Sequence, residues 1–399
     1  MTVPLDPEAL TTSIESTLAA AVDGGAVPGV VAGVTTAEHT VAAGAAGVRS
    51  TADAAPMTVD TVVALFSATK TITTTAVLRL VDRGDLDLDA PARDHLPALG
   101  DIGVVDGFDD DGTPQVRPAR SVITTRHLLT HTAGFGYDFY DRTYRRLADD
   151  GRLKDVVTAT RASLDAPLLF DPGTRWEYGI STDWAGLLVE AVTGRRLDSA
   201  IADLVLDPIG MSDTRFGVGD DLRARRATIH HRTSDGGLRP NARFEHPAEP
   251  EAFMGGHGMY STVGDYLTLL RMWLRDGRSD HGEQILRPET VAAAASDQLG
   301  SLSVHPLPGL NPKVSNDVDL LPDVEKTWGL GFLVNTEPTP TGRAAGSISW
   351  AGLANLYFWI DRASGIAGFW ATQVLPFADP SALRHFTDFE SAVYRTLAR

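Results

Sequence analysis

The segment Phe66-Ser67-Ala68-Thr69-Lys70 combines a possible nucleophile with a possible base. Side chains three positions apart share a face of a helix, so Ser67 and Lys70 are expected to point in the same direction. A serine hydroxyl is a weak nucleophile until a base takes its proton, and a lysine amine becomes such a base when burial or a like charge lowers its pKa. A helix start also offers a free backbone N–H beside the serine. The pair therefore predicts nucleophilic catalysis by serine.

A plainer interpretation competes with this one, because serine often caps a helix and most lysines lie in solvent. The lysine content helps to decide. The chain has four lysines, at positions 70, 154, 313 and 326, and its other basic side chains are arginine. Arginine cannot give up its proton, so a lysine in such a chain can mark a role that arginine cannot fill. None of the other three lysines follows a serine at this spacing.

Two later segments carry residues that could complete such a site. Tyr178 lies just before a predicted helix, in the sequence WEYGIS of residues 176–181. A tyrosine whose pKa is lowered by a nearby lysine can shuttle a proton. Residues 347–353 (SISWAGL) form an apolar strand pattern interrupted by glycine, which often marks close approach of a ligand to the backbone. A backbone N–H here could complete an oxyanion hole with that of Ser67. Taken singly, each segment also fits core packing.

In this order, the serine–lysine pair, the tyrosine and the Trp-Ala-Gly strand resemble the motifs of class C β-lactamases, penicillin-binding DD-peptidases and family VIII carboxylesterases. Within that superfamily, residues 107–120 and Tyr178–Gly186 (YGISTDWAG) look most like the family VIII esterases and the statin-type acyltransferase that shares their fold. Further segments similar to the superfamily's landmarks come in its order and span nearly the whole chain: Arg126–Tyr137 (RHLLTHTAGFGY), Asp207–Phe216 (DPIGMSDTRF), Gly255–Thr262 (GGHGMYST) and Trp328–Phe332 (WGLGF).

The resemblance implies a role for each matching residue. Ser67 is expected to be the nucleophile, and Lys70 and Tyr178 to share the general base and acid work. The backbone N–H groups of Ser67 and Leu353 are expected to form the oxyanion hole. Asp183 matches a carboxylate near the lysine in some of these esterases, and it also suits a helix cap. Residues expected to bind substrate are Tyr137, Trp350, Gly352, Asp183 and His257.

Two departures from the β-lactamase pattern favour an ester substrate. β-Lactamases and DD-peptidases usually carry asparagine two residues after the tyrosine, where this chain has Ile180. They also carry Lys-Thr-Gly on the last strand, and its lysine helps to bind the substrate carboxylate. Trp350-Ala351-Gly352 replaces it here. Loss of a cation and an amide weakens recognition of β-lactams and peptides. We therefore expect a serine carboxylesterase that acts on short- to medium-chain acyl esters through an acyl-enzyme, with no cofactor and no metal.

Three alternatives stay open at this stage. An alcohol or amine could intercept the acyl-enzyme, which would make the protein an acyltransferase. The site could turn over β-lactams or act as a D-aminopeptidase. A relative that binds ligand without turnover would be a third possibility, although the joint presence of Ser67, Lys70 and Tyr178 speaks against it.

Other constellations have less support. His127 and His131 are four residues apart, as zinc ligands on a helix can be, but no H-E-x-x-H sequence frames them. His257 could be the base of a Ser–His–Asp triad, but the chain has no G-x-S-x-G nucleophile elbow. Pairs of spaced glycines lack the third glycine of a dinucleotide site, and no P-loop is present.

Composition excludes several classes of partner and cofactor. The net charge of −17 argues against nucleic acid and anionic membranes, since both attract basic patches. The absence of cysteine excludes disulfides and cysteine-ligated metals. Residues 1–20 have no basic side chain and do not fit a secretory signal. We expect a cytoplasmic enzyme with a small-molecule ester as substrate.

The elements that must hold these residues follow from hydrophobic periodicity. Helices are expected over 8–22, 67–83, 182–192 and 380–397, and strands over 27–34, 39–47, 347–352, 356–360 and 366–374. Residues 107–120 fit a loop or a small hairpin. Strands at both ends of the chain predict an α/β fold with one central antiparallel sheet flanked by helices. Residues 1–85 and 250–399 would form this domain, and 86–249 an inserted, mainly helical one. The loops 107–120, 135–165 and 300–325 are expected to shape the substrate pocket.

Overall fold

A seven-stranded sheet forms the centre of the computed structural model, which describes residues 6–397. Every neighbouring pair in the sheet is antiparallel. The pairing of β14 with β1 joins the two ends of the chain, which confirms the predicted central sheet. In spatial order the strands are β10 (Lys326–Trp328), β11 (Leu333–Asn335), β12 (Ile348–Gly352), β13 (Leu356–Asp361), β14 (Ile366–Ala371), β1 (Gly29–Thr36) and β2 (Thr40–Gly47).

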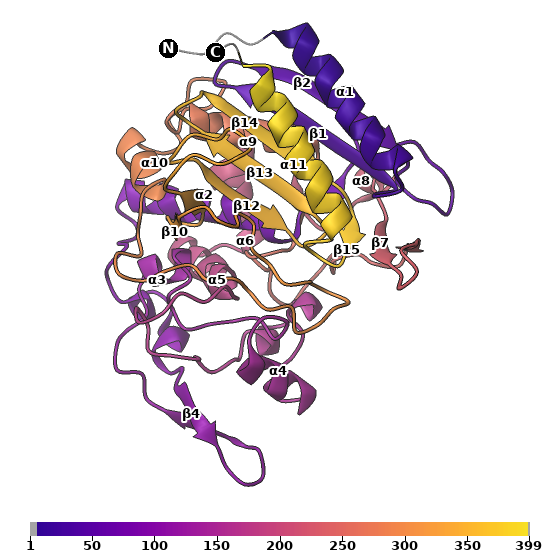
Figure 1. Ribbon diagram of the computed structural model, residues 1–399. Helices are drawn as coiled ribbons and strands as arrows, with labels where there is room; N and C mark the ends of the chain where they lie inside the picture. The colour runs from indigo at the N-terminus through magenta and orange to yellow at the C-terminus, as the bar shows by residue number, and fades with distance from the viewer. Residues whose placement is uncertain (1–5, 398–399) are drawn as a thin grey trace.

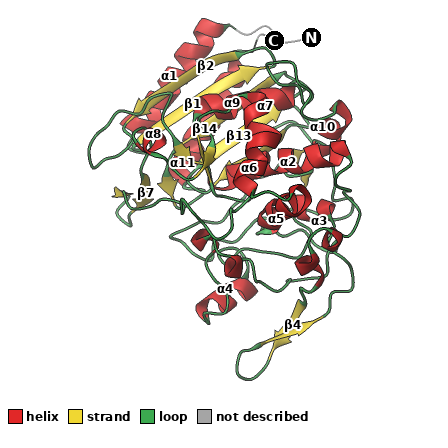
Figure 2. Ribbon diagram, turned by 180° about the vertical axis from the view of Figure 1, so that it is seen from behind, coloured by secondary structure: helices red, strands yellow, loops and turns green. Residues whose placement is uncertain are grey.

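Helices cover both faces of this sheet. On one face, α1 (Pro7–Asp23) lies along β2 and packs against α11 (Pro380–Arg395), as Figure 1 shows in indigo and yellow. On the other face, α9 (Val263–Leu274) packs on β1 and β14, and Figure 2 shows it from that side. A helical region lies below the sheet in both views, and the hairpin of β4 (Val104–Phe108) and β5 (Pro114–Arg117) projects from it. The remaining helices are α2 (Thr69–Arg83), α3 (Thr125–Leu129), α4 (Arg142–Asp149), α5 (Ser181–Thr193), α6 (Leu197–Ile201), α7 (Asp207–Ile209), α8 (Asp220–Arg223) and α10 (Pro288–Ala294).

Short strands form three further units, a sheet β15-β7-β8, a sheet β3-β9-β6 and the β4–β5 hairpin. The hairpin was predicted as one of two possibilities for residues 107–120. The predicted strand 366–374 is divided, because β15 leaves the central sheet and pairs in parallel with β7. The strands are β3 (Val63–Ala64), β4 (Val104–Phe108), β5 (Pro114–Arg117), β6 (Arg215–Phe216), β7 (Ile229–Arg232), β8 (Leu238–Asn241), β9 (Met259–Ser261) and β15 (Val374–Leu375).

The region predicted as a helical insertion, residues 86–249, contains α3 to α8 together with strands β4 to β8. Its helices α3 and α5 pack on one another, and α5 packs on α2. The division into two domains therefore remains a prediction. No helix within residues 6–397 has the length and apolar character needed to cross a membrane.

Helix α2 is buried over almost its whole length, which explains a composition that opposes helix formation. Thr71, Thr73, Thr74 and Thr75 are all buried. β-Branched threonine is a poor helix former, so tertiary contacts must hold it. Thr73 donates to the carbonyl of Gly255 at 2.7 Å, and Thr75 donates to its own helix at Thr71. At the C-terminal end, Gly84 adopts a φ of 79° and closes the helix.

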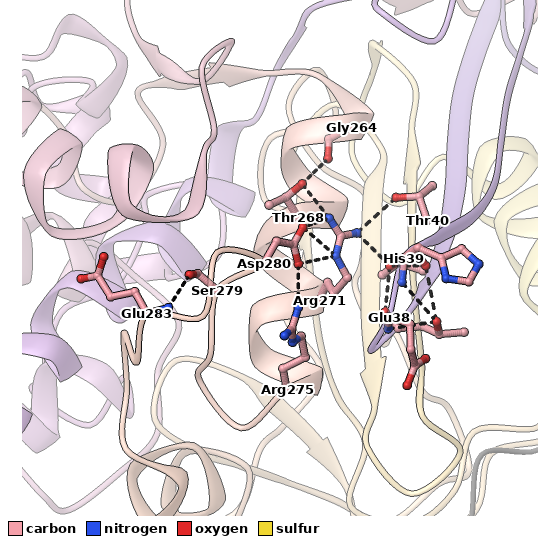
Figure 3. A network of polar contacts seen from close by, with 12 residues as sticks. Glu38, His39, Thr40, Gly264, Thr268, Arg271, Arg275, Ser279, Asp280 and Glu283 are labelled. Atoms are coloured by element: carbon pink, nitrogen blue, oxygen red, sulfur yellow. Dashed lines mark hydrogen bonds and ion pairs between the residues drawn. The ribbon is translucent and has the colours of Figure 1, made fainter.

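A buried arginine ties α9 to the edge of the sheet. Arg271 donates to the Asp280 carboxylate at 2.8 Å and to the hydroxyls of Thr35, Thr40 and Thr268 (Figure 3). Arg271 lowers the pKa of Asp280 by hydrogen bonding to the ionised form. The network fixes α9, and α9 in turn supports β1 and β14.

We expect Arg271→Met to lower the free energy of unfolding by about 2 kcal/mol, because it removes a charged donor from a partly buried carboxylate and from three threonine hydroxyls. Urea unfolding followed by circular dichroism measures it. Since the Asp280 pKa is depressed in the folded state, the loss is full at pH 7 and shrinks as pH falls below about 4. Arg278→Met, at an exposed arginine, is the control. An equal loss in both variants would contradict the role of the network.

Candidate active site

A tight turn presents Ser67 at the entrance to α2. Leu65 donates its N–H to Met259 of β9, and residues 66–68 then form one 3₁₀ turn. Phe66 adopts a φ of 46°, in the left-handed region that residues other than glycine rarely enter. Its ring is held by stacking on Phe244 at 5.5 Å and by an edge contact with His246 at 5.3 Å. Aromatic packing thus stabilises the unusual turn that aims the serine.

Lys70 lies one turn further along and is 2% exposed. Its ammonium donates to Ser67 Oγ at 3.3 Å, to the Tyr137 hydroxyl at 3.0 Å and to the Gly256 carbonyl at 2.9 Å. These three acceptors use all three N–H donors of a lysine. Burial lowers the pKa of Lys70 to about 8, although the nearby Asp183 carboxylate opposes this change. A neutral Lys70 can keep its bonds to Tyr137 and Gly256 and accept the proton of Ser67.

Tyr178 approaches the serine from the other side. Its hydroxyl is hydrogen bonded to Ser67 and accepts from Trp350 Nε1 at 3.0 Å. The ammonium of Lys70 lies 5.0 Å from the centre of its ring. We expected a lysine to lower the pKa of this tyrosine, and that prediction is wrong: burial raises the pKa, and the bonds from Ser67 and Trp350 only oppose it. Tyr178 is therefore suited to donate and relay a proton as a neutral phenol.

Strand β12 closes the site opposite the serine turn. A Cβ at Gly352 would lie 2.3 Å from the carbonyl oxygen of Leu65, so only glycine allows β12 to approach this closely. Ser67 and Leu353 consequently line one cavity. Their backbone N–H groups, expected as the oxyanion hole, come from the two sides of this contact.

The cavity at Ser67 is small, at about 20 Å³. Trp350 and Gly352, both predicted to bind substrate, are in its wall. No lysine, arginine or amide side chain lines it, which gives the cavity an apolar and aromatic character. Its walls are Ser67, Phe139, Tyr140, Tyr178, Leu307, Val318, Trp350, Ala351, Gly352, Leu353 and Phe377.

Three other residues predicted to bind substrate do not line this cavity. Tyr137 turns its hydroxyl to Lys70. Asp183 is fully buried and accepts the N–H of Gly256 at 2.8 Å. His257 faces Asp183, with Nδ1 3.4 Å from Oδ1. None of the three is among the residues that line the cavity, and direct contact between them and the substrate stays a prediction.

Asp183 and Lys70 are both hydrogen bonded to the backbone of Gly256. Gly256 donates its N–H to Asp183 and accepts from Lys70 with its carbonyl oxygen. A Cβ at Gly256 would meet Asp183 Oδ2 at 2.6 Å, so glycine is required for this approach. The Asp183 carboxylate thus holds the Gly256 backbone in place, and the Gly256 carbonyl in turn holds Lys70.

The two histidines considered as zinc ligands have other roles. His127 belongs to the capping box of α3, whereas His131 lies beyond the end of that helix with a φ of 55°. The His131 ring packs 4.8 Å from the Tyr178 ring, and burial holds its pKa well below the usual value. No group of three potential metal ligands occurs within residues 6–397.

Sequence reasoning missed the aromatic and aliphatic walls Phe139, Tyr140, Leu307, Val318 and Phe377 as individual residues. The loops 135–165 and 300–325 were expected to shape the pocket and supply four of the five, whereas the hairpin 107–120 lies elsewhere.

A larger cavity of about 640 Å³ lies between that hairpin and α5. No serine, lysine, histidine or tyrosine lines it, so it offers no comparable chemistry.

Comparison with known proteins places this site in a family. The family model for β-lactamase matches residues 14–391, and the chain therefore belongs to the β-lactamase family. The monacolin J acid methylbutanoyltransferase of Aspergillus terreus is 33% identical over 85% of this chain and 83% of its own length. The lovastatin esterase of Penicillium rubens is 33% identical over 91% of this chain and 93% of its own.

A solved structure gives the same result for the fold. Unliganded simvastatin synthase from Aspergillus terreus superposes with a TM-score of 0.83 at 30% identity, over 98% of each chain. The fold is thus β-lactamase-like, as predicted. The relatives include acyltransferases and an esterase, and the chain is an acyl-transferring or hydrolytic enzyme of the serine type.

We expect catalysis to depend on a neutral Lys70. Because the pKa of Lys70 is lowered to about 8, the amine is protonated below that pH. The kcat/KM for p-nitrophenyl butyrate, corrected for spontaneous hydrolysis, should therefore rise about tenfold per pH unit up to pH 8 and then level off.

Asp183→Asn provides the test of the cause. Asp183 raises the pKa of Lys70, so removing its charge should lower that pKa further and move the rise in kcat/KM to lower pH. Asp265→Asn, at another buried carboxyl whose pKa is raised by burial, should leave the profile in place. A profile that is unmoved in Asp183→Asn, or moved upward, would contradict this electrostatic account.

Proposed function

We propose that the protein is an acyltransferase that carries an acyl group on Ser67 and passes it to an alcohol. The observation that carries this proposal is the small apolar cavity around the Ser67–Lys70–Tyr178 cluster. Its apolar and aromatic lining suits an uncharged acyl group. The transferase relatives support the same choice, in preference to the carboxylesterase expected from the sequence.

The proposed reaction has two halves. Neutral Lys70 takes the proton of Ser67, and Oγ attacks the acyl carbon of the donor. The N–H groups of Ser67 and Leu353 hold the oxyanion, which collapses as Tyr178 protonates the leaving group. The acceptor alcohol then loses its proton to the same groups and attacks the acyl-enzyme. The acyl group leaves as part of the ester product, and the Ser67 hydroxyl recovers its proton.

Hydrolysis is the second candidate. The lovastatin esterase relative covers almost the full length of the chain, and a water molecule that reaches the acyl-enzyme gives this outcome with the same residues. Membership of the family VIII esterases is part of this second, hydrolytic candidate function. β-Lactam turnover is less favoured, because Ile180 and Trp350 stand where the β-lactamase pattern has an amide and a cation.

The ratio of transfer to hydrolysis tests the proposal. The enzyme is given p-nitrophenyl 2-methylbutanoate with increasing monacolin J acid or simple secondary alcohols, chosen because one relative is named for that transfer. Products are separated by liquid chromatography and mass spectrometry. We expect ester product to exceed free acid at millimolar acceptor, and both to disappear in Ser67→Ala. Free acid alone at every acceptor concentration would establish a hydrolase.

A further inference from the structure

The turn after α3 places His131 against the segment that carries Tyr178. Helix α3 ends at Leu129, and His131, two residues later, adopts a φ of 55° in the left-handed region. Residues other than glycine rarely adopt this conformation, although histidine is among those that tolerate it best. Such conformations persist where the surrounding structure holds them, and they are common at functional sites. The His131 side chain is buried, so protein surrounds it.

His131 is bonded to both neighbours of Tyr178 in the chain. Its carbonyl oxygen accepts the N–H of Glu177 at 2.9 Å, and its ring nitrogen Nδ1 accepts the N–H of Gly179 at 3.4 Å. The centre of the imidazole ring also lies 4.8 Å from the centre of the Tyr178 ring. One residue therefore binds the backbone on either side of the tyrosine and contacts the tyrosine ring itself.

The bond to Gly179 determines where the imidazole carries its proton. Nδ1 can accept an N–H only if it has no proton of its own, so the proton of the neutral ring must be on Nε2. Burial holds the pKa of His131 well below its usual value, and the charge of Lys70 lowers it further. The ring is therefore uncharged beside the lysine. A charged imidazole would carry a proton on Nδ1 and would lose the bond to Gly179.

The Tyr178 hydroxyl needs this support because it lies at the far end of a long side chain. It is hydrogen bonded to Ser67 and accepts from Trp350 Nε1 at 3.0 Å. A small rotation of the backbone at Tyr178 would move the hydroxyl out of line with both partners. A misplacement of about 1 Å at a reacting group costs roughly a hundredfold in rate.

We propose that His131 is a positioning residue that holds the Tyr178 hydroxyl at the point where it protonates the leaving group. It acts through the backbone bonds to Glu177 and Gly179 and through the contact of the two rings. Histidine combines what this place requires, namely tolerance of a left-handed backbone, an aromatic ring and an uncharged acceptor. The proposal rests on the acid role of Tyr178 in the proposed function, and it holds whether an alcohol or water receives the acyl group.

Two esters of the same acid separate positioning from general damage to the enzyme. p-Nitrophenolate leaves without a proton, whereas ethoxide needs one from an acid. The kcat/KM for ethyl butyrate divided by that for p-nitrophenyl butyrate, each corrected for the activity of Ser67→Ala, therefore reports leaving-group protonation. We expect His131→Phe, which keeps a ring but has no acceptor, to lower this ratio about thirtyfold, a part of what a general acid contributes. A merely structural loss would lower both values by the same factor.

Three further variants make the test specific. Tyr178→Phe removes the acid and should give the lowest ratio. His131→Asn tolerates the left-handed turn and offers an acceptor, so it should recover part of the ratio. His127→Phe is the matched control, because the Nδ1 of His127 also accepts a backbone N–H, from Thr124 at 3.3 Å, but within the capping box of α3. It should leave the ratio unchanged. Circular dichroism confirms that each variant is folded.

The outcomes separate the positioning role from the proposed function. A wild-type ratio in His131→Phe beside a low ratio in Tyr178→Phe would overturn the role of His131. An equal fall of the ratio in His127→Phe would overturn it as well. An unchanged ratio in Tyr178→Phe would instead contradict the acid role of that tyrosine in the proposed function.

Nuclear magnetic resonance tests the contact without requiring turnover. The chain has 11 histidines, and in ¹⁵N-histidine-labelled protein the ring signals of His131 are those missing from His131→Phe. Near neutral pH we expect a proton on Nε2 and none on Nδ1. A proton on Nδ1 would overturn the proposal, whatever the two esters show. If neither ester is turned over, the proposed function is contradicted, and the position of the proton still supports or overturns the bond between His131 and Gly179.

Discussion

The structure of the site depends on one buried amine. Lys70 is surrounded by protein, and its three hydrogen bonds reach the serine turn, the loop after α3 and the glycine segment before β9. A buried ammonium without partners is strongly unfavourable, so these three segments must meet at one point if the lysine is to be tolerated. The same burial that demands the partners lowers the pKa of the lysine and so makes it a usable base. Packing and reactivity therefore have a single cause.

The need to surround Lys70 with hydrogen-bond partners explains how the neighbouring elements pack. Two glycines allow the approaches that side chains would prevent: Gly256 lies against Asp183, and Gly352 lies against the turn that carries Ser67. Helix α2 is buried so completely that Thr73 donates to a neighbouring segment at the Gly255 carbonyl, and such tertiary contacts compensate for the poor helix propensity of threonine. The central sheet, made from both ends of the chain, brings β12 to the serine although about 280 residues separate them.

Much of this could be predicted from the sequence, and the failures have physical reasons. Periodicity located the main helices and strands, and spacing together with family resemblance selected Ser67, Lys70 and Tyr178, which the structure brings together. The direction of the Tyr178 pKa shift was wrong because burial cannot be known from the local sequence. Tyr137, Asp183 and His257 were predicted to bind substrate, but they do not line the cavity at Ser67, because a motif does not show on which side of the lysine a side chain lies. Leu307 and Val318 lie in a loop with no periodic pattern, so their contact with the site depends on tertiary structure alone.

The central claim is that the buried lysine makes Ser67 the carrier of the acyl group. Rapid acid quenching of the enzyme after mixing with p-nitrophenyl butyrate, followed by mass spectrometry of the intact protein and its peptides, tests this claim most directly. The account predicts a single butyryl group on the peptide that contains Ser67, and no such adduct in Ser67→Ala. A butyryl group on any other residue, or an adduct that survives Ser67→Ala, would contradict it.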